Sequence, residues 1–417
     1  MTADDRLTTG RPARWSMGEK REGPAPESWV GRELEVEVGP VAHGGHCVAR
    51  YDGRVVFVRH AIPGERAIAR VTEGHEGSRY LRADAVEVLR ASTDRVEPPC
   101  PVAGPGRCGG CDFQHVAPAR QRVLKSEVVR EQLLRLARLD VPVEVEPVPG
   151  DREGLGWRTR VLWSATPDRQ KGLLAHRSDR VVPVDRCLIA HPDLPDPAAT
   201  LASGNPTATS VVTSTGDAVI VAPGSPVADV VEVAAGRRWR VGAGGFWQVH
   251  PGAADALVAA AMEGLRLLAG ERCWDLYAGV GLFSGAMAAA VGPEGAVVAV
   301  ESHRRAARLA KQNLDDMPHV RVVADRVDRF VRSRIAQGRL DAVLLDPPRS
   351  GAGRDVVRRI AAQRPRVVTY VACDPAALAR DVGTFVDAGY GLDSLRAFDL
   401  FPMTHHVECV AVLTPRT

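Results

Sequence analysis

Apolar and polar positions alternate in short runs near the start of the chain and in longer mixed blocks towards its end. Between Trp29 and about Arg90 the segments ELEVEV, RVVFVRHA and ERAIARV are separated by turn sequences rich in glycine. Short alternating runs at this spacing predict a small β-barrel. From Val241 onward, apolar runs such as RCWDLYA, GAVVAVE and LDAVLLD alternate with helical patterns such as RRAARLAKQNL. That alternation predicts a mostly parallel sheet covered by helices.

The pattern divides the chain into four parts. Residues 1–27 have almost no apolar periodicity and are predicted to be a flexible tail. The barrel is expected at 28–90. Residues 91–240 combine a loop rich in Cys, Gly and Pro, a helical segment and strand-like stretches, which predicts a central α+β domain. The α/β domain is expected at 241–417.

Composition narrows the class of protein. With 417 residues, 45% of them hydrophobic and 25% charged, the chain is long enough for two or three domains with a sizeable core. The longest apolar runs are far shorter than the ~18 residues that a membrane span needs, and a signal-type segment is absent. We therefore expect a cytoplasmic protein without membrane association. The net charge of +3 neither requires nor excludes nucleic acid.

The ends of the expected parallel strands carry the candidate chemistry, because ligands bind beyond the carboxyl ends of such strands. The first ends in the glycine-rich turn DLYAGVGLFSG, and the second ends in Glu301, twenty residues beyond Gly281. A carboxylate there is placed to accept hydrogen bonds from ribose hydroxyls. A nicotinamide dinucleotide and S-adenosylmethionine both fit these features. The fourth strand ends in LLDPPRSG, and a stiff turn after Asp346 favours a methyltransferase that presents a planar base to a methyl donor.

Cys373 ends the next strand, in YVACDP, and is expected on the same rim as Asp346. A thiolate that adds to carbon 6 of uracil makes carbon 5 nucleophilic enough to attack a sulfonium methyl group. A base must then remove the carbon-5 proton before the thiolate leaves. Glu408 is the candidate base, at the start of a strand expected beside that of Cys373.

Six ordered motifs carry a resemblance between Gly245 and Leu413. They are GFWQVHP, DLYAGVGLFS, VVAVES, LLDPPRSG, YVACDP and FPMTHHVE. In this region the chain resembles the RNA 5-methyluridine methyltransferases, the uracil-5 enzymes that act on tRNA and 23S rRNA. The similarity extends through most of the upstream chain. It implies a Rossmann-like methyltransferase domain with Cys373 as nucleophile and Glu408 as base.

The resemblance also implies a cofactor site. Residues expected to contact S-adenosylmethionine are Gln248, Tyr277, Leu282, Glu301, Asp325 and Asp346. Three positions depart from the family pattern. His250 stands where Asn is common, Leu282 replaces an Asn in the glycine-rich turn, and Met403 replaces a Gln before the base. The change at Leu282 affects one cofactor contact and leaves the chemistry intact.

The same resemblance identifies the barrel as a TRAM domain, related to the OB folds that bind RNA. Residues 117–140 have six basic and three acidic side chains, and 151–190 have eight and five. The central segment is therefore the better candidate for following RNA phosphates. The expected partner is tRNA or 23S rRNA, bound by a monomer.

A second cysteine group lies in CPVAGPGRCGGCDFQH. Its spacing, C-x7-C-x2-C, lets Cys100, Cys108 and Cys111 surround one centre, with distant Cys187 as a fourth ligand. Zinc is the alternative, with His115 completing the site in place of Cys187. The resembled family carries a 4Fe–4S cluster on this arrangement in many members, which favours iron–sulfur.

Three other functions remain open. An exocyclic-amine methyltransferase would use the Asp-Pro-Pro turn without needing Cys373. A non-catalytic RNA-binding factor would retain only the cofactor pocket. RNA cytosine-5 methyltransferases usually carry a Cys directly after the Pro of this motif, where this chain has Arg349.

Overall fold

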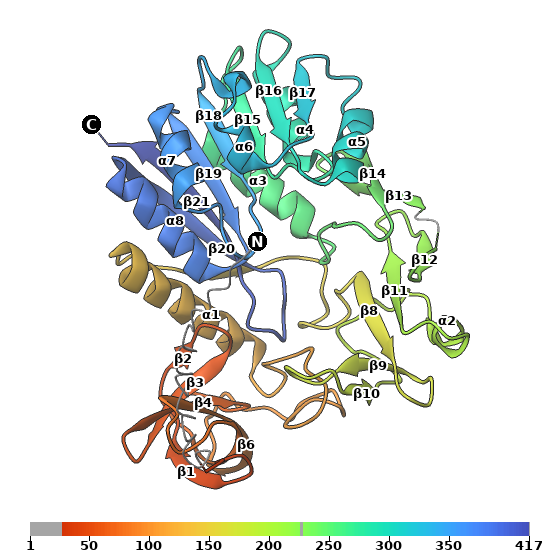
Figure 1. The fold of residues 1–417 in the computed structure, drawn as a ribbon, viewed down its shortest axis with the longest axis vertical. Helices are drawn as coiled ribbons and strands as arrows, with labels where there is room; N and C mark the ends of the chain where they lie inside the picture. The colour runs from red at the N-terminus through yellow and green to blue at the C-terminus, as the bar shows by residue number, and fades with distance from the viewer. Residues whose placement is uncertain (1–26, 226–227, 417) are drawn as a thin grey trace, which may run out of the picture.

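The computed structural model describes residues 27–225 and 228–416 (Figure 1). The tail expected at residues 1–27 lies outside the described residues, apart from Glu27. Figure 1 shows the barrel at one end of the molecule, the α/β part at the other, and helix α1 (Pro118–Gln132) between them. Among the helices described, none combines the length and apolar content needed to cross a membrane.

The N-terminal barrel is one curled sheet with the strand order β1-β5-β6-β4-β3-β2. Its strands are β1 (Glu33–Glu37), β2 (Val41–Ala42), β3 (His46–Tyr51), β4 (Arg54–Arg59), β5 (Arg66–Glu73) and β6 (Tyr80–Arg90). In β1 the side chains of Leu34 and Val36 are buried and the three Glu side chains between and beside them are exposed. Strict alternation of this kind places one face of the sheet on a core. The predicted barrel is confirmed.

The central part holds a five-stranded antiparallel sheet with the order β10-β9-β8-β11-β12. These elements are β8 (Arg160–Ala165), β9 (Lys171–Leu174), β10 (Val181–Pro183), α2 (Ala198–Ala202), β11 (Thr207–Val212) and β12 (Ala218–Val221). Helix α1 continues into a π-helical turn at Leu133–Ala137, which ends at Arg138 in a left-handed conformation. Strands β13 (Asp229–Ala234) and β14 (Arg237–Gly242) form a separate hairpin.

The C-terminal part is built on an eight-stranded sheet with the order β17-β16-β15-β18-β19-β21-β20-β7. The strands are β7 (Val145–Pro147), β15 (Arg272–Leu276), β16 (Ala296–Val300), β17 (Val320–Val323), β18 (Ala342–Leu345), β19 (Val367–Ala372), β20 (Tyr390–Asp399) and β21 (Glu408–Pro415). The helices are α3 (Ala253–Leu265), α4 (Leu282–Val291), α5 (Arg304–Asn313), α6 (Val327–Phe330), a 3-10 turn (Arg334–Ala336), α7 (Arg354–Ala362) and α8 (Pro375–Asp387). Strands β15 to β19 pair in parallel, and β21 pairs antiparallel to β19. The Rossmann-like α/β class is confirmed.

Two features differ from the simple four-part division. β7 lies within residues 91–240, yet it pairs in parallel with β20 and so extends the C-terminal sheet. Residue 240 lies inside β14, whose pairing with β13 runs across that position. The domain boundaries expected from the sequence stay predictions.

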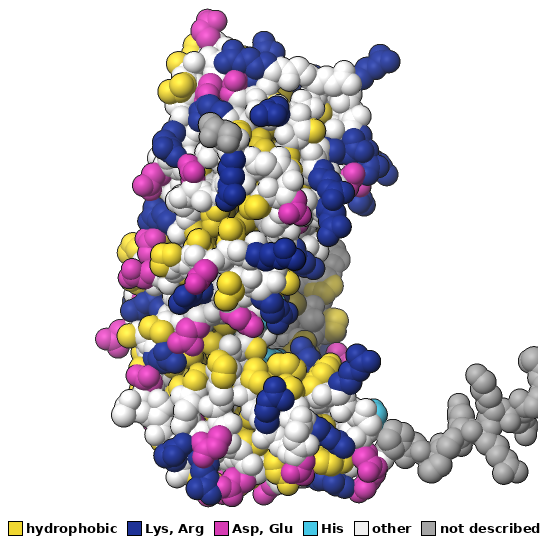
Figure 2. Space-filling model, turned by 90° about the vertical axis from the view of Figure 1, so that its left-hand side faces the viewer, with side chains coloured by type: hydrophobic (Ala, Val, Ile, Leu, Met, Phe, Trp, Pro, Cys, Tyr) yellow, Lys and Arg dark blue, Asp and Glu magenta, His cyan; other side chains and the backbone are white. Residues whose placement is uncertain are grey.

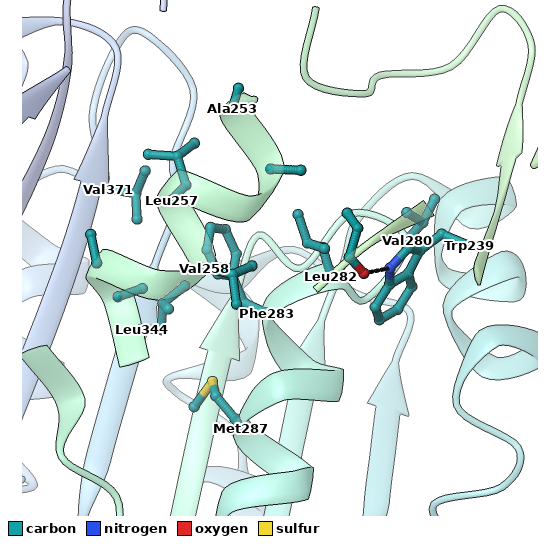
Figure 3. Packing of buried hydrophobic residues seen from close by; sticks show 14 of the residues in the cluster. Trp239, Ala253, Leu257, Val258, Val280, Leu282, Phe283, Met287, Leu344 and Val371 are labelled. Carbon is teal, nitrogen blue, oxygen red and sulfur yellow. Dashed lines mark hydrogen bonds between the residues drawn. The ribbon is translucent and has the colours of Figure 1, made fainter. Parts of the chain in front are cut away.

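The core beneath the rim of the sheet is shown in Figure 3. Leu257 and Val258 of α3 and Phe283 of α4 pack together above β18 and β19, and all three are buried. The indole of Trp239 lies against α4 and donates a hydrogen bond to the carbonyl of Ala234 at 3.0 Å. A Cβ atom at Gly285 would lie 2.6 Å from this ring, so glycine is what lets α4 approach the hairpin so closely.

Candidate active site

The carboxyl ends of the central strands meet at one edge of the sheet. Cys373 follows β19 directly, and Glu408 begins β21 beside it, because Ala372 pairs with Cys409 in the antiparallel register. Asp346 follows β18, the neighbour of β19 on its other side. The strand arrangement therefore brings Cys373, Glu408 and Asp346 to the same edge of the sheet, called the rim below.

Helix α8 fixes the position of Cys373 from the other direction. Asp374 caps the helix by accepting a hydrogen bond from the amide of Ala377 at 2.8 Å, and Pro375 occupies the first helical position. Cap and proline fix the turn between strand and helix. Cys373 is held in this turn and is half-buried.

A cavity of about 220 Å³ opens in front of Cys373. All three parts of the chain line this Cys373 pocket. The lining residues are His43, Gly44, Gly45, Phe113, Leu124, Lys125, Val128, Arg349, Cys373, Asp374, Pro375, His405 and His406. The first three form the turn between β2 and β3 of the barrel, where both glycines adopt left-handed φ angles of 92° and 77°.

That barrel turn touches the active-site helix directly. The Nε2 atom of His43 lies 3.0 Å from Oδ2 of Asp374. This contact between the barrel and the active-site helix was not predicted from the sequence, which indicated only a small barrel that binds RNA or serves for packing. The available signal was the pair of adjacent glycines in the HGGH turn, since such a turn lets backbone approach another surface closely.

Burial governs the ionisation of the rim. Burial raises the pKa of Glu408 well above its usual range, the charge of Asp346 raises it further, and Arg349 opposes both. Burial likewise raises the pKa of Cys373 to about 11, helped by Glu408 and opposed by Arg349. In the protein without substrate, burial therefore favours the uncharged forms of Glu408 and Cys373. Arg349 is the positive charge that favours ionisation of both.

The expected cofactor residues occupy several elements. Tyr277, Glu301 and Asp346 follow the adjacent strands β15, β16 and β18, so they share the rim. The Glu301 carboxylate accepts a hydrogen bond from the amide of Gly279 at 2.9 Å, which holds the glycine-rich turn against it. Gln248 lies in the loop before α3, and Asp325 follows β17.

The side chain of Leu282 points into the core around Trp239 (Figure 3). This side chain contributes apolar packing, as expected for a Leu at a position where the family commonly has Asn.

Asp275, at the penultimate position of β15, was missed by the sequence analysis. It is fully buried, and burial raises its pKa to about 7. The hydroxyl of Ser284 in α4 donates to its Oδ2 atom, while Oδ1 has no partner among the described atoms. A carboxylate within the apolar run RCWDL was the signal for it. The pair ties the glycine-rich turn to the strand that precedes it.

The cysteine loop (residues 100–116) and Cys187 meet at a second cavity. Cys100, Cys108, Cys111 and Cys187 all line it, and no carboxylate does. His115, the ligand expected for zinc, lies elsewhere, with Nε2 3.5 Å from the carbonyl of Ala61. Across residues 27–225 and 228–416, no three His, Cys, Asp or Glu side chains come close enough together to hold a metal ion.

The surroundings of these thiols still suit a group held by sulfur. Cys108 Sγ accepts from the amide of Gly110 and Cys111 Sγ from the side-chain amide of Gln114, both at 3.4 Å. Burial raises the pKa of each of these two thiols and the neighbouring thiols raise it further, which favours the thiol over the thiolate form that binds a metal. Hydrogen bonds to sulfur are a usual feature around metal thiolates. Four thiols are the ligand type that an iron–sulfur cluster needs, although the sulfur atoms do not lie close enough together in this structure to surround a metal ion.

Comparison with known proteins gives matches over nearly the whole chain. Residues 27–86 match the TRAM domain family, and residues 227–416 match the family described as tRNA (Uracil-5-)-methyltransferase. An uncharacterized RNA methyltransferase of Streptomyces avermitilis is 50% identical over 93% of this chain and 99% of its own length. One from Bifidobacterium longum is 37% identical over 92% and 97%.

A solved structure shares the fold over most of its length. The tRNA (uracil-54, C5)-methyltransferase of Pyrococcus abyssi, in complex with S-adenosyl-L-homocysteine, superposes with a TM-score of 0.68 at 22% identity. The match covers 91% of this chain and 100% of the other. Together with the sequence relatives, these matches show that the chain belongs to the tRNA (uracil-5-)-methyltransferase family, with an N-terminal TRAM domain, and is an RNA methyltransferase.

Proposed function

We propose that this enzyme methylates carbon 5 of a uridine in tRNA or 23S rRNA through a covalent adduct with Cys373. The observation that carries the proposal is the pairing of β19 with β21, which sets the thiol that lines the Cys373 pocket beside a buried carboxyl on the neighbouring strand. S-adenosylmethionine supplies an electrophilic methyl group. The glycine-rich turn, Glu301 and Asp346 are the residues that would hold it beside the pocket.

The chemistry needs Cys373 first and Glu408 second. Cys373 first loses its proton to water, and the thiolate then bonds to carbon 6 while the electrons of the 5,6 double bond move into the ring carbonyl as an enolate. The enolate returns them through carbon 5, which takes the methyl group and leaves a neutral thioether on the donor. Glu408, in its ionised form, then removes the carbon-5 proton, the double bond re-forms, and the bond from carbon 6 to sulfur breaks.

The target base must leave its stack to reach Cys373, because the pocket is small and walled on several sides. An unpaired uridine in a loop is thus the favoured substrate. On the face drawn in Figure 2, Lys and Arg side chains alternate with Asp and Glu over the full height. Charge on that face alone does not single out an RNA path, so the shape of the pocket is the better guide. Mapping 5-methyluridine in tRNA and 23S rRNA from a deletion strain identifies the target.

Two variants separate the catalytic roles. Cys373→Ala is expected to bind RNA yet give neither methylated product nor a covalent complex. Glu408→Gln keeps the nucleophile, so methylated RNA should accumulate as a covalent complex that survives a denaturing gel and disappears on nuclease treatment. Cys409→Ala, which removes a buried thiol next to Glu408, is the matched control and should turn over. Methylation by Cys373→Ala would favour an amine-methylating enzyme instead.

We further propose that Cys100, Cys108, Cys111 and Cys187 hold a 4Fe–4S cluster of structural role. Support comes from the shared cavity, the absence of carboxylates lining it, and the hydrogen bonds to sulfur. Protein purified without oxygen should be brown and contain iron and sulfide, and Cys187→Ser should bleach it. Cys47→Ser, which changes a buried thiol in the barrel, should leave the colour intact. Colourless protein with stoichiometric zinc would contradict the proposal.

A further inference from the structure

A line of hydrogen-bonded side chains connects the barrel and the cysteine loop with the Cys373 pocket. Asp112, next to Cys111, accepts at Oδ1 from Arg59 of β4 at 3.3 Å. Its Oδ2 atom lies 2.6 Å from Nδ1 of His405 and accepts from the His405 backbone amide at 3.2 Å. Arg59 is 6% exposed and Asp112 9%. Away from water, such bonds hold their geometry strongly.

The line continues to the rim. The ring centroids of His405 and His406 lie 4.1 Å apart, and Nε2 of His406 is 3.3 Å from a guanidinium nitrogen of Arg349. These three side chains line the Cys373 pocket. Glu408 follows two residues after His406. The orientation of His405 therefore bears on Arg349 and on the backbone that carries Glu408.

Backbone hydrogen bonds also connect the cysteine loop with the segment before Glu408. The amides of Asp112 and Phe113 both donate to the carbonyl of Met403, at 2.9 and 3.0 Å. On another side, a Cβ atom at Gly45 would lie 2.6 Å from Cβ of His405, so the barrel turn touches this histidine. His405 is confined by Asp112, His406 and the barrel turn. Confinement from several elements defines one orientation for a side chain.

We propose that Asp112 and His405 are a positioning pair, through which the cysteine loop holds residues 403–408 in their working geometry. The inference rests on the proposed function for its catalytic consequence. Neither residue bonds to the substrate carbon or to the methyl group. Their effect passes through Arg349 and Glu408, and a displacement of about 1 Å at such groups can lower a rate about a hundredfold.

The test compares Asp112→Ala, His405→Ala and His405→Asn. Asparagine can donate from its side-chain amide, so it can restore the bond to Asp112 that alanine removes. Both alanine variants should lower kcat about tenfold or more with little change in KM for RNA or methyl donor, and should slow adduct formation with 5-fluorouridine RNA. His405→Asn should recover most of the rate. Asp393→Ala, an exposed carboxylate paired with Arg266, is the control.

Iron content separates positioning from damage to the cysteine loop, since His405→Ala should keep its iron and still lose kcat. Wild-type kcat in His405→Ala, or equal losses in His405→Asn and His405→Ala, would overturn the inference. Hydrogen exchange tests it without methylation. Amides 403–409 should exchange faster in both alanine variants and regain protection in His405→Asn, and unchanged protection would also overturn it. A wild-type protein that forms no adduct would count against the proposed function alone.

Discussion

Burial changes the ionisation of single side chains at the rim of the sheet. The positions of Cys373 and Glu408 at one edge of the sheet could be predicted from the sequence, because Cys373 follows a parallel strand and Glu408 begins a strand expected beside it. Their catalytic roles stay predictions. Asp112 and His43 could not be predicted, because each acquires its role from a contact about 300 residues away in the chain. Nor does the sequence reveal the raised pKa of Glu408, which follows from burial that only the folded rim provides.

Glu408→Gln is expected to stabilise the protein at high pH. The folded protein binds the Glu408 proton more tightly than the unfolded chain does, so wild-type stability falls as pH rises above about 4.3 towards the folded pKa. Glutamine does not ionise and escapes this loss. Denaturant unfolding should show a gain in stability for the variant at pH 8 that shrinks as the pH is lowered towards 5. Glu263→Gln, at an exposed site, is the control, and a gain independent of pH would contradict the argument.

Elements with a clear period were predictable, and those without one were not. Strands β18 and β19 are buried along their whole length, and their unbroken apolar runs are typical of central parallel strands. β7 has only three residues and no period of its own. It forms because the edge of β20 offers backbone partners. The π-helical turn after α1 could not be predicted from the sequence either, because its apolar pattern is the same as that of an ordinary α-helix.

Gly285→Ala tests how tightly α4 is packed. A methyl group there would lie 2.6 Å from the Trp239 ring, and overpacking of this kind costs about 1–3 kcal/mol. The expected loss of stability runs against helix propensity, which favours alanine by about 1 kcal/mol. Ala289→Leu, on the exposed face of α4, should leave the free energy of unfolding nearly unchanged. A more stable Gly285→Ala protein would show that the helix can move away from the hairpin.

At the scale of the whole molecule, a buried ion pair joins the central segment to the C-terminal sheet. Lys125 of α1 lies 2.6 Å from Asp399 at the end of β20 and also donates to the carbonyl of Phe401 at 3.1 Å. The Lys125 side chain is 0% exposed. A single lysine in a mixed helix gave no sequence signal for this role. The arrangement of the three parts was the least predictable property, because it depends on such isolated contacts.

Lys125→Met should destabilise the protein by about 3–5 kcal/mol, because it leaves Asp399 buried without its partner. The double variant Lys125→Met with Asp399→Leu removes both charges and should recover most of that loss. Denaturant unfolding of the wild type and the variants measures the coupling. If the double variant is no more stable than Lys125→Met, the pair is not what joins the two parts.

The segments that line the Cys373 pocket are synthesised at different times. One wall is the barrel turn at 43–45 and another is the segment at 405–406. During synthesis the barrel emerges long before the residues that close the pocket. A nascent chain can thus contain the folded barrel before the site is complete, and the methyl transfer proposed above becomes possible only once residues 405–408 have been made.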